Sequence, residues 1–380
     1  MKAPATSSLA SALRTEWLLS LGVASTVLFF LFGKAWLADL SNAAWTLFLF
    51  LWLFGAILTS AFGVVRHADC LAIKLGEPLG TLILTLVVIG IEVMMIAALM
   101  LNGDPDPTMA RDTMFAVLMI VLNGLLGIAL VAGGWRHREQ NYNLQGAMTF
   151  LTMLLPLAAF GLVLPYYAQA TTSPSLSILR AVALIVITIG LYCVFLAVQT
   201  RRHPDYFREA AGVHSSDEVG EASEHAGLEV RSVPIHALLL LAWLLPVILL
   251  TKKLAVVLDD GAERLGAPPA LSGIVVALLI LTPEGMAGVR AAWGNRLQRS
   301  VNLLFGAALT TIALTVPAVI CISLITGKSI QLGLSPTSQI LLAVTLAVST
   351  LTCVTGRTNI LHGFIHLVLF VAYFILIFES

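Results

Sequence analysis

Long apolar stretches recur along the whole of this 380-residue chain, and they restrict its fold more than any other feature. Residues 43–65, 111–133 and 175–199 are three examples, and each exceeds the roughly 20 residues that a helix needs to cross a bilayer. Inside a bilayer every backbone N–H and C=O group must be bonded within the protein, and a helix does this within one segment. The pattern therefore predicts an all-α polytopic membrane protein.

The composition supports this prediction, since 58% of the residues are apolar, 11% are charged and the mean hydropathy is +0.95. Soluble domains carry about 25% charged residues, so a soluble protein of this length is excluded. The first apolar run has no small-residue cleavage site after it, and we expect a retained span rather than a signal peptide. We predict eleven transmembrane helices: 15–37, 43–65, 76–101, 111–133, 145–168, 175–199, 234–256, 268–292, 300–325, 335–355 and 359–378.

The distribution of lysine and arginine predicts how these spans are oriented. With a cytoplasmic N-terminus, the inner segments hold 14 of the 21 basic residues and the outer segments hold 7. Because basic residues concentrate in cytoplasmic loops, we expect the N-terminus to be cytoplasmic and the C-terminus to be outside. The one long polar connection, residues 200–233, is mostly acidic and would then be a cytoplasmic loop.

One predicted span carries a carboxylate near its middle. Glu284 lies in the apolar run 273–293, between Pro283 and Gly285. A charge at that depth costs about 2.5–3.5 kcal/mol on insertion scales. Proline removes one helical N–H and displaces the carbonyl four residues earlier, here that of Leu279. The sequence therefore predicts a helix break at Pro283 and Gly285, where a carboxylate and freed carbonyl oxygens offer the ligands of a hard cation.

A second acid, Glu92, lies in the span 76–101, two residues after Gly90, where we expect another helix break. Glu92 and Glu284 are five spans apart, so their helices cross the membrane in opposite directions. Two inverted five-helix repeats plus one extra N-terminal helix, with an acid in the centre of each repeat, are typical of secondary transporters. The predicted organisation is an N-terminal segment and extra helix (1–42), a first repeat (43–199), the acidic loop (200–233) and a second repeat (234–380).

Neutral oxygen ligands would complete a site made by two glutamates. Amides and hydroxyls in or beside the central spans are the candidates: Asn123, Thr282, Asn302, Thr310 and Thr311. A polar stretch at the cytoplasmic end of span two allows two interpretations. It is either a topology anchor followed by a helix start, in which Glu77 occupies a first turn that favours negative charge, or a cytoplasmic gate. The candidate gate residues are Arg66, Asp69 and Glu77.

Two histidines of the last span, His362 and His366, are spaced so that they share a helix face. A metalloprotease would need a glutamate directly after the first of them, and Gly363 stands there. The favoured interpretation of the two histidines is a buried, hydrogen-bonded pair or a minor proton relay. A membrane enzyme that uses both histidines is kept as an alternative hypothesis. The sequence contains no phosphate-binding loop and no nucleotide fingerprint, so it predicts no enzyme, no cofactor and no nucleic-acid partner.

Three stretches resemble the cation/proton exchanger (CAX) family, in particular its bacterial calcium/sodium–proton antiporters. They are RHADCLAIKLGEPLGTLILTLVVIGIEV (66–93), LLILTPEGMAGVRAAWGNRLQRSVNLLFG (278–306) and GRTNILHG (356–363). The resemblance implies eleven spans, two inverted halves and an acidic cytoplasmic segment between spans six and seven. It also implies that Glu92 and Glu284 are the family's signature acids. In the family these acids follow Gly-Asn sequences, whereas Gly90-Ile91 and Thr282-Pro283 precede them here.

From this resemblance Asn123 matches a family Ser-Asn pair on span four, and Thr310 or Thr311 stands where a family glutamine lies on span nine. We expect a secondary antiporter of the bacterial inner membrane that exchanges Ca²⁺ for H⁺. We also expect it to exchange Na⁺ for H⁺, and K⁺ is a further candidate. The alternative is a monovalent Na⁺(K⁺)/H⁺ antiporter. The expected partners are membrane lipid, the transported cations and protons, and the family implies rocking of spans two and seven against the centre.

Overall fold

The computed structural model describes residues 16–75, 79–100, 107–167, 178–208, 231–268 and 270–379. Almost all of this part of the chain is helical, as the sequence predicted. The chain packs as two compact units. The first is formed by Met1–Ile91 with Ser215–Arg264, and the second by Glu92–His214 with Leu265–Ser380.

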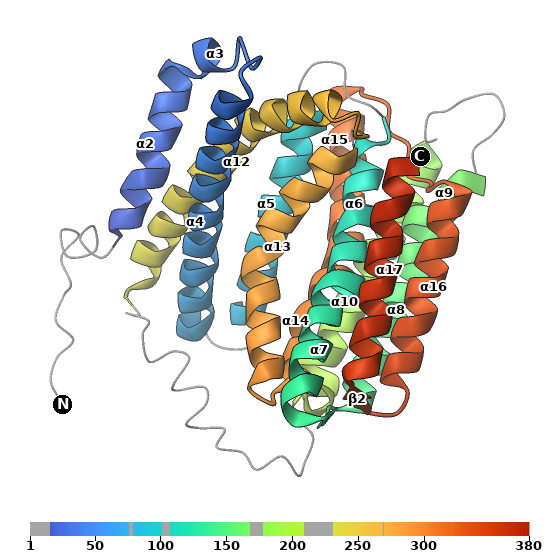
Figure 1. Ribbon diagram of the computed structural model, residues 1–380. Coiled ribbons are helices and arrows are strands. Elements are labelled where there is room, and N and C mark those ends of the chain that lie inside the picture. Colours follow the sequence, from blue (N-terminus) through green and yellow to red (C-terminus); the bar gives the residue numbers. More distant parts are fainter. Residues whose placement is uncertain are drawn as a thin grey trace, which may run out of the picture. The chain divides into compact units, whose positions relative to one another are not determined.

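The first unit is built on three long or medium helices that contact one another. The helices α4 (Ala43–Leu75) and α12 (Val233–Arg264) pack together, and α2 (Trp17–Leu31) packs against both, as Figure 1 shows in blue and yellow. The short helix α3 (Gly33–Trp36) follows α2. Many large apolar side chains of these helices are exposed, among them Phe30 and Leu51. Apolar residues on all faces are expected of helices that meet protein on one side and lipid on the other.

Two glycines allow the helices of the first unit to approach closely. Trp243 of α12 lies directly against Gly63 of α4, where an added Cβ would overlap the indole ring. A Cβ on Gly22 of α2 would lie 2.8 Å from Ser60 Oγ and 3.3 Å from Pro246. Small residues at such positions are how membrane helices gain close packing without a hydrophobic driving force.

The second unit holds the rest of the fold. Its elements are α5 (Leu79–Met100, of which 92–100 belong here), α6 (Met109–Met119), η1 (Ile120–Leu125), α7 (Leu126–His137), β1 (Glu139–Asn141), α8 (Leu144–Ala158), η2 (Ala159–Val163), α9 (Leu164–Tyr167), α10 (Ile178–Ala197), η3 (Val198–Arg202), η4 (Pro204–Phe207), α13 (Ala270–Trp293), α14 (Leu297–Thr310), η5 (Thr311–Thr315), α15 (Val316–Thr326), α16 (Pro336–Cys353), β2 (Arg357–Asn359) and α17 (Ile360–Glu379). A single apolar core, which includes Met114, Phe150, Phe305 and Ile312, lies between these helices.

Nine helices of the described chain are long and apolar enough to cross a membrane, which confirms a helical membrane protein. The apolar helix α2 has only 15 residues. The predicted limits were most in error for α4 and α12, which continue well beyond residues 65 and 256. These extensions contain charged residues that are paired: Arg66 binds Glu16 and Arg264 binds Asp260. Ion pairing lets a helix continue past the end of its apolar run.

The predicted helix breaks at Gly90, Pro283 and Gly285 are wrong. Both α5 and α13 run through these residues as continuous α-helices, with Pro283 inside α13. A proline removes only one hydrogen bond, and neighbouring helices in a membrane bundle can stabilise the helix around it. The backbone departs from α geometry in other helices instead, as the four π-helical segments η1, η2, η3 and η5 among the described residues. Such segments are frequent at functional sites.

A two-stranded ribbon, which the sequence analysis did not predict, joins two hairpins of the second unit. Strand β1 follows α7, strand β2 precedes α17, and the two pair antiparallel with Gln140 opposite Thr358. The Gln140 side chain is buried, and its Nε2 donates to Ala292 O (2.8 Å) and to Asn295 Oδ1 (3.0 Å). The ribbon is therefore also bonded to the C-terminal end of α13.

We expect Gly63→Ala to destabilise the protein by about 1–3 kcal/mol, because overpacking forces neighbouring groups to move and the indole of Trp243 occupies the space for a Cβ. Gly55→Ala is the matched control, since Gly55 lies on the same helix with no atom near its added Cβ. The measurement is the thermal unfolding midpoint of each purified variant in detergent. Equal midpoints for the two variants would contradict the close contact.

Candidate ion-binding site

The carboxylate of Glu92 is buried in the second unit, with 6% of the residue exposed. Its Oε2 accepts a hydrogen bond of 2.9 Å from the hydroxyl of Thr311. Thr315 also faces this carboxylate, but without a hydrogen bond of normal geometry. The other oxygen, Oε1, is buried and has no hydrogen-bond partner in the described part of the chain. A buried carboxylate oxygen in this position can accept a proton or a cation.

The two threonines belong to the π-helical segment η5, which interrupts the helix Leu297–Thr326. Thr311 and Thr315 are four residues apart and therefore lie on one side of the helix. Thr310 precedes this segment. Its hydroxyl donates to backbone carbonyls of the same helix, Gly306 O (2.9 Å) and Ala307 O (3.0 Å). Of the neighbouring residues Thr310 and Thr311, Thr311 is therefore the one whose hydroxyl donates to the Glu92 carboxylate.

Glu284 lies on α13, next to a close contact between this helix and the π-helical segment η1. An added Cβ on Gly285 would lie 2.6 Å from the side chain of Leu125, the last residue of η1. The helix α13 also contacts α6, α7 and α14. The close approach at Gly285 therefore places the backbone beside Glu284 against η1, the segment that contains Asn123.

Asn123 is fully buried, and its amide is bonded to two other helices. Its Nδ2 donates to Thr345 Oγ1 of α16 (2.9 Å), and its Oδ1 lies 3.3 Å from Nδ1 of His366 on α17. Because an amide oxygen only accepts, the proton of His366 is on Nδ1. Its Nε2 then accepts from the hydroxyl of Thr352 (3.2 Å). Of the predicted buried, hydrogen-bonded pair, His366 is fully buried and hydrogen-bonded, whereas His362 is half-buried.

The other predicted neutral ligands make different contacts. The Thr282 hydroxyl donates to Leu278 O (2.7 Å) in its own helix. Asn302 donates to Phe207 O (2.6 Å) and accepts from Gln298 (2.8 Å), so it joins α14 to η4. Among the five predicted neutral ligands, Thr311 is the one whose hydroxyl donates to Glu92 in the described part of the chain. Hydroxyl oxygens that donate to backbone keep a free lone pair for a cation.

Side chains fix one end of each glutamate-bearing helix. Lys328 Nζ donates to Met100 O (2.9 Å), the last carbonyl of α5. At the end of α13, Ala292 O accepts from Gln140, and Trp293 O is 3.3 Å from Arg136 Nη1. The last carbonyls of a helix have no partner within the helix. These donors satisfy them and hold α5 and α13 in position.

The candidate gate residues lie only partly in the described chain. Arg66 pairs with Glu16 in the first unit, Asp69 is on the same helix α4, and Glu77 falls outside the described residues. His362 Nδ1 accepts from Asn359 N (3.3 Å) near the start of α17. Among the residues that the structure describes, no three His, Cys, Asp or Glu side chains come together as a metal centre.

The sequence matches a known family over most of its length. The model of the sodium/calcium exchanger protein family matches residues 45–201 and 235–379. The putative ionic transporter y4hA of Sinorhizobium fredii (strain NBRC 101917 / NGR234) is 42% identical over 325 residues, which cover 85% of this chain and 86% of the relative. The sodium-potassium/proton antiporter ChaA of Escherichia coli (strain K12) is 41% identical over 322 residues, with the same coverage of 85% and 86%.

A solved structure of the Ca²⁺/H⁺ antiporter protein YfkE has a similar fold, with a TM-score of 0.71 and 18% sequence identity over 96% of this chain and 98% of that one. This chain belongs to the sodium/calcium exchanger family. The resemblance inferred from the three sequence stretches is therefore confirmed, and a family of ion exchangers supports a transport protein rather than an enzyme.

We expect Thr345→Val to lower the free energy of unfolding by about 1–3 kcal/mol, because it removes the oxygen acceptor of the buried Asn123 amide and leaves the weaker acceptor Met119 Sδ at 3.5 Å. Thr350→Val is the matched control on the same helix, since the Thr350 hydroxyl donates only to Leu346 O (2.8 Å). Denaturant unfolding in detergent compares the two. A Thr345 variant as stable as the Thr350 variant would mean that Asn123 does not depend on this hydrogen bond.

Proposed function

We propose that this chain is a secondary active antiporter that exchanges cations for protons by alternating access, with Glu92 and Glu284 as the ion-binding and proton-coupling residues. The observation that carries the proposal is the buried carboxylate of Glu92, in a chain that belongs to a family of ion exchangers. The 41% identity to a sodium-potassium/proton antiporter gives further support. The proposal includes no cofactor and no catalytic residue.

Coupling follows from the cost of burying charge. An ionised carboxylate away from water requires a nearby positive charge or must become neutral. In the proposed cycle, each glutamate holds either a proton or the cation, and binding of one releases the other. The transporter changes the side to which it opens only when both acids are neutralised. Membrane lipid, cations and protons are then its partners.

Neutral oxygens complete the proposed site around the two acids. Thr311 is the best supported, since its hydroxyl already contacts Glu92. Thr282 lies two residues before Glu284, and Thr310 adjoins Thr311. Asn123 and Asn302 receive less support as direct ligands, because their amides bind other helices. We propose that Asn123 instead fixes the path of η1 beside α13.

The identity of the cation divides the proposal into two forms. The similarity to a sodium-potassium/proton antiporter, at 41% identity, favours Na⁺ and K⁺. Two glutamates suit Ca²⁺, which takes about 6–8 oxygen ligands and would replace two protons. We keep Ca²⁺ with Na⁺ as the form predicted from the sequence and exchange of monovalent ions alone as its alternative.

We also propose eleven transmembrane helices, in two inverted five-helix repeats (43–199 and 234–380) after an N-terminal segment and helix (1–42). The two stretches that match the family are separated by residues 202–234, close to the proposed acidic loop 200–233. The predicted fourth and ninth spans each contain a central π-helix, η1 and η5. The similar position of η1 and η5 in these two spans supports related repeats, whereas η2 and η3 have no counterpart in α16 and α17.

The proposed location is the bacterial inner membrane, with the N-terminus in the cytoplasm and the C-terminus outside. The basic residues of the predicted inner segments support this orientation. Arg66, Asp69 and Glu77 would then lie at the cytoplasmic side, where we propose that they form a gate.

The central test is cation-driven proton flux in proteoliposomes. We expect Glu92→Gln and Glu284→Gln each to lower the flux more than about tenfold, because an amide cannot exchange a proton for a cation at a buried site. Glu263→Gln is the control, since Glu263 is an exposed glutamate at the end of α12. Wild-type flux in either buried-acid variant would remove that residue from the mechanism.

The same vesicles separate the two forms of the proposal. Ca²⁺, Na⁺ and K⁺ are compared under one pH gradient. Proton release with Na⁺ or K⁺ and none with Ca²⁺ selects the monovalent alternative, whereas release with Ca²⁺ selects the calcium form. A wild-type protein that responds to none of the three would contradict the proposed function itself.

We expect Thr311→Val to weaken the apparent cation affinity by about tenfold, equivalent to roughly 1.4 kcal/mol, because it removes a hydrogen bond to the site carboxylate. Thr310→Val should leave the affinity close to that of the wild type, since the Thr310 hydroxyl bonds to its own helix. The half-saturating cation concentration of proteoliposome flux is the measured quantity. Equal shifts in both variants would argue against a specific role for Thr311.

A further inference from the structure

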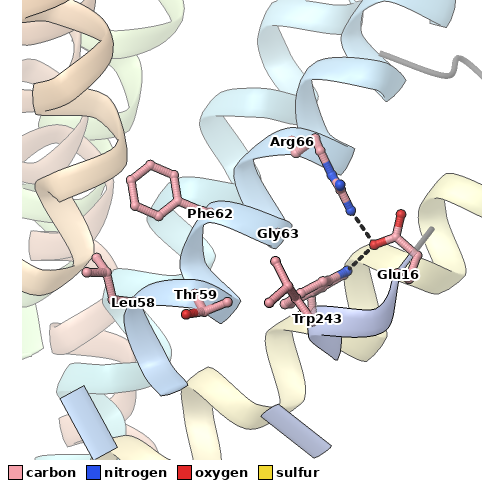
Figure 2. A pocket seen from close by; sticks show the side chains of 8 residues that line it. Glu16, Leu58, Thr59, Phe62, Gly63, Arg66 and Trp243 are labelled. Atoms are coloured by element: carbon pink, nitrogen blue, oxygen red, sulfur yellow. Dashed lines mark hydrogen bonds and ion pairs between the residues drawn. The ribbon is translucent and has the colours of Figure 1, made fainter. Parts of the chain in front are cut away.

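A second group of buried polar side chains lies in the first unit, apart from the two proposed transport glutamates. Glu16, directly before α2, is at its centre, with 5% of its side chain exposed. Its Oε2 accepts a hydrogen bond from the guanidinium of Arg66 and another from Trp243 Nε1 (3.1 Å), as Figure 2 shows. His67 Nε2 lies 3.4 Å from the same oxygen. Three side chains from α4 and α12 thus converge on one carboxylate oxygen.

The contacts continue from His67 to α12. Nδ1 of His67 lies 3.0 Å from Nδ1 of His236, and both residues are buried. The other ring nitrogen of His236, Nε2, accepts the backbone N–H of Arg231 at 2.8 Å. A continuous row of hydrogen-bonding groups therefore runs from the start of α12 to Glu16.

The backbone N–H of Arg231 fixes every proton position in this row. Because this N–H only donates, His236 Nε2 carries no proton, and the neutral ring must carry its proton on Nδ1. That Nδ1–H donates to His67 Nδ1, which is then the acceptor. His67 in turn carries its proton on Nε2, which lies 3.4 Å from Glu16 Oε2. The 3.4 Å approach of Arg66 to His67 Nε2 is then a charge contact rather than a hydrogen bond.

An additional proton cannot enter the row of imidazoles without breaking it. A proton on His67 Nδ1 would face the Nδ1–H of His236. A proton on His236 Nε2 would face the N–H of Arg231. In each case two donors meet, and at least one hydrogen bond is lost. The intact row requires both imidazoles to be neutral.

The surrounding charges are balanced only in that state. The charged or titratable groups that act on the His67 ring are Glu16, Arg66 and His236. Asp69 and Arg231 lie further out, and both act on the buried thiol of Cys70. With two carboxylates and two guanidiniums, the cluster has no formal net charge. One added proton gives it a positive charge in a largely apolar environment, which is unfavourable without a new partner.

The cluster adjoins a cavity of about 350 Å³ in the first unit. Glu16 and Arg66 line it together with apolar groups such as Leu58 and Phe62. The Arg66 side chain is 41% exposed. The cavity is far larger than the roughly 30 Å³ that one water occupies in the liquid, and Glu16 and Arg66 supply polar groups at which water can bind.

We propose that the Glu16–His67–His236 row is a proton-binding site, separate from Glu92 and Glu284, whose neutral imidazoles link α4 to α12 and lose this link when the row takes up a proton. The ligand is H⁺ delivered by water in the cavity. Uptake of one proton on His67 Nδ1 raises the charge of the cluster by one and removes the His67–His236 hydrogen bond. The hydrogen bonds of Glu16 to Arg66 and Trp243, and the packing of Trp243 on Gly63, are retained.

The test is nitrogen NMR of the full-length protein in lipid nanodiscs with ¹⁵N-labelled histidine. At pH 8 we expect one imidazole protonated on Nδ1, another on Nε2, and a through-hydrogen-bond ¹⁵N–¹⁵N coupling between the Nδ1 atoms of two rings. On titration to pH 4 this coupling should disappear in a single step, together with both tautomer signatures. No transport is measured, so the result does not depend on the proposed function.

Variants identify the resonances and supply the control. His236→Asn should abolish the coupling at all pH values, whereas His203→Gln, which changes an exposed histidine, should leave it intact. If His236→Asn does not fold, the titration of the wild-type protein still decides. Absence of the coupling at pH 8 would overturn the proposal. So would a coupling that persists unchanged at pH 4, or two rings that titrate independently.

Discussion

A carboxylate enclosed by apolar helices is the constraint on which the second unit depends. Glu92 is buried, and one of its oxygens is held by Thr311. For that hydroxyl to reach the acid, the helix Leu297–Thr326 adopts the π-helical segment η5 at Thr311. The position of α5 must also be fixed, and Lys328 does this at its last carbonyl. The π-helical segment η5 and the distant Lys328 thus both fix the surroundings of the Glu92 carboxylate.

The helices and the acids could be predicted because their signals lie within single segments. A span such as Ile178–Arg202 is recognisable from its length and apolar content alone. Glu92 and Glu284 stand out because a charge in such a segment is costly and therefore rare. The partners of Asn123 could not be predicted in this way. Thr345 and His366 are more than 200 residues away in sequence, and only the packing of α16 and α17 brings them to it.

The prediction of broken helices failed for a related reason. Pro283 has a strong local effect on hydrogen bonding, but whether a helix breaks there depends on its neighbours. The π-helical segments η1 and η5 contain no proline, but Pro317 follows η5 and lacks the N–H that would bond Ala313 O within it. Glu16 was overlooked because it stands at the edge of an apolar run, where an acid before a helix is ordinary. Its partners Arg66 and Trp243 come from other helices.

The β1–β2 ribbon has a mechanical consequence for the second unit. It links the turn after α7 to the turn before α17, and Gln140 bonds it to the end of α13. The turns that follow α7 and α13 and the turn that precedes α17, which are far apart in sequence, are therefore bonded to one another at one end of their helices. Any displacement of one of these helices is transmitted to the others, and relative movement among them is greatest at their opposite ends.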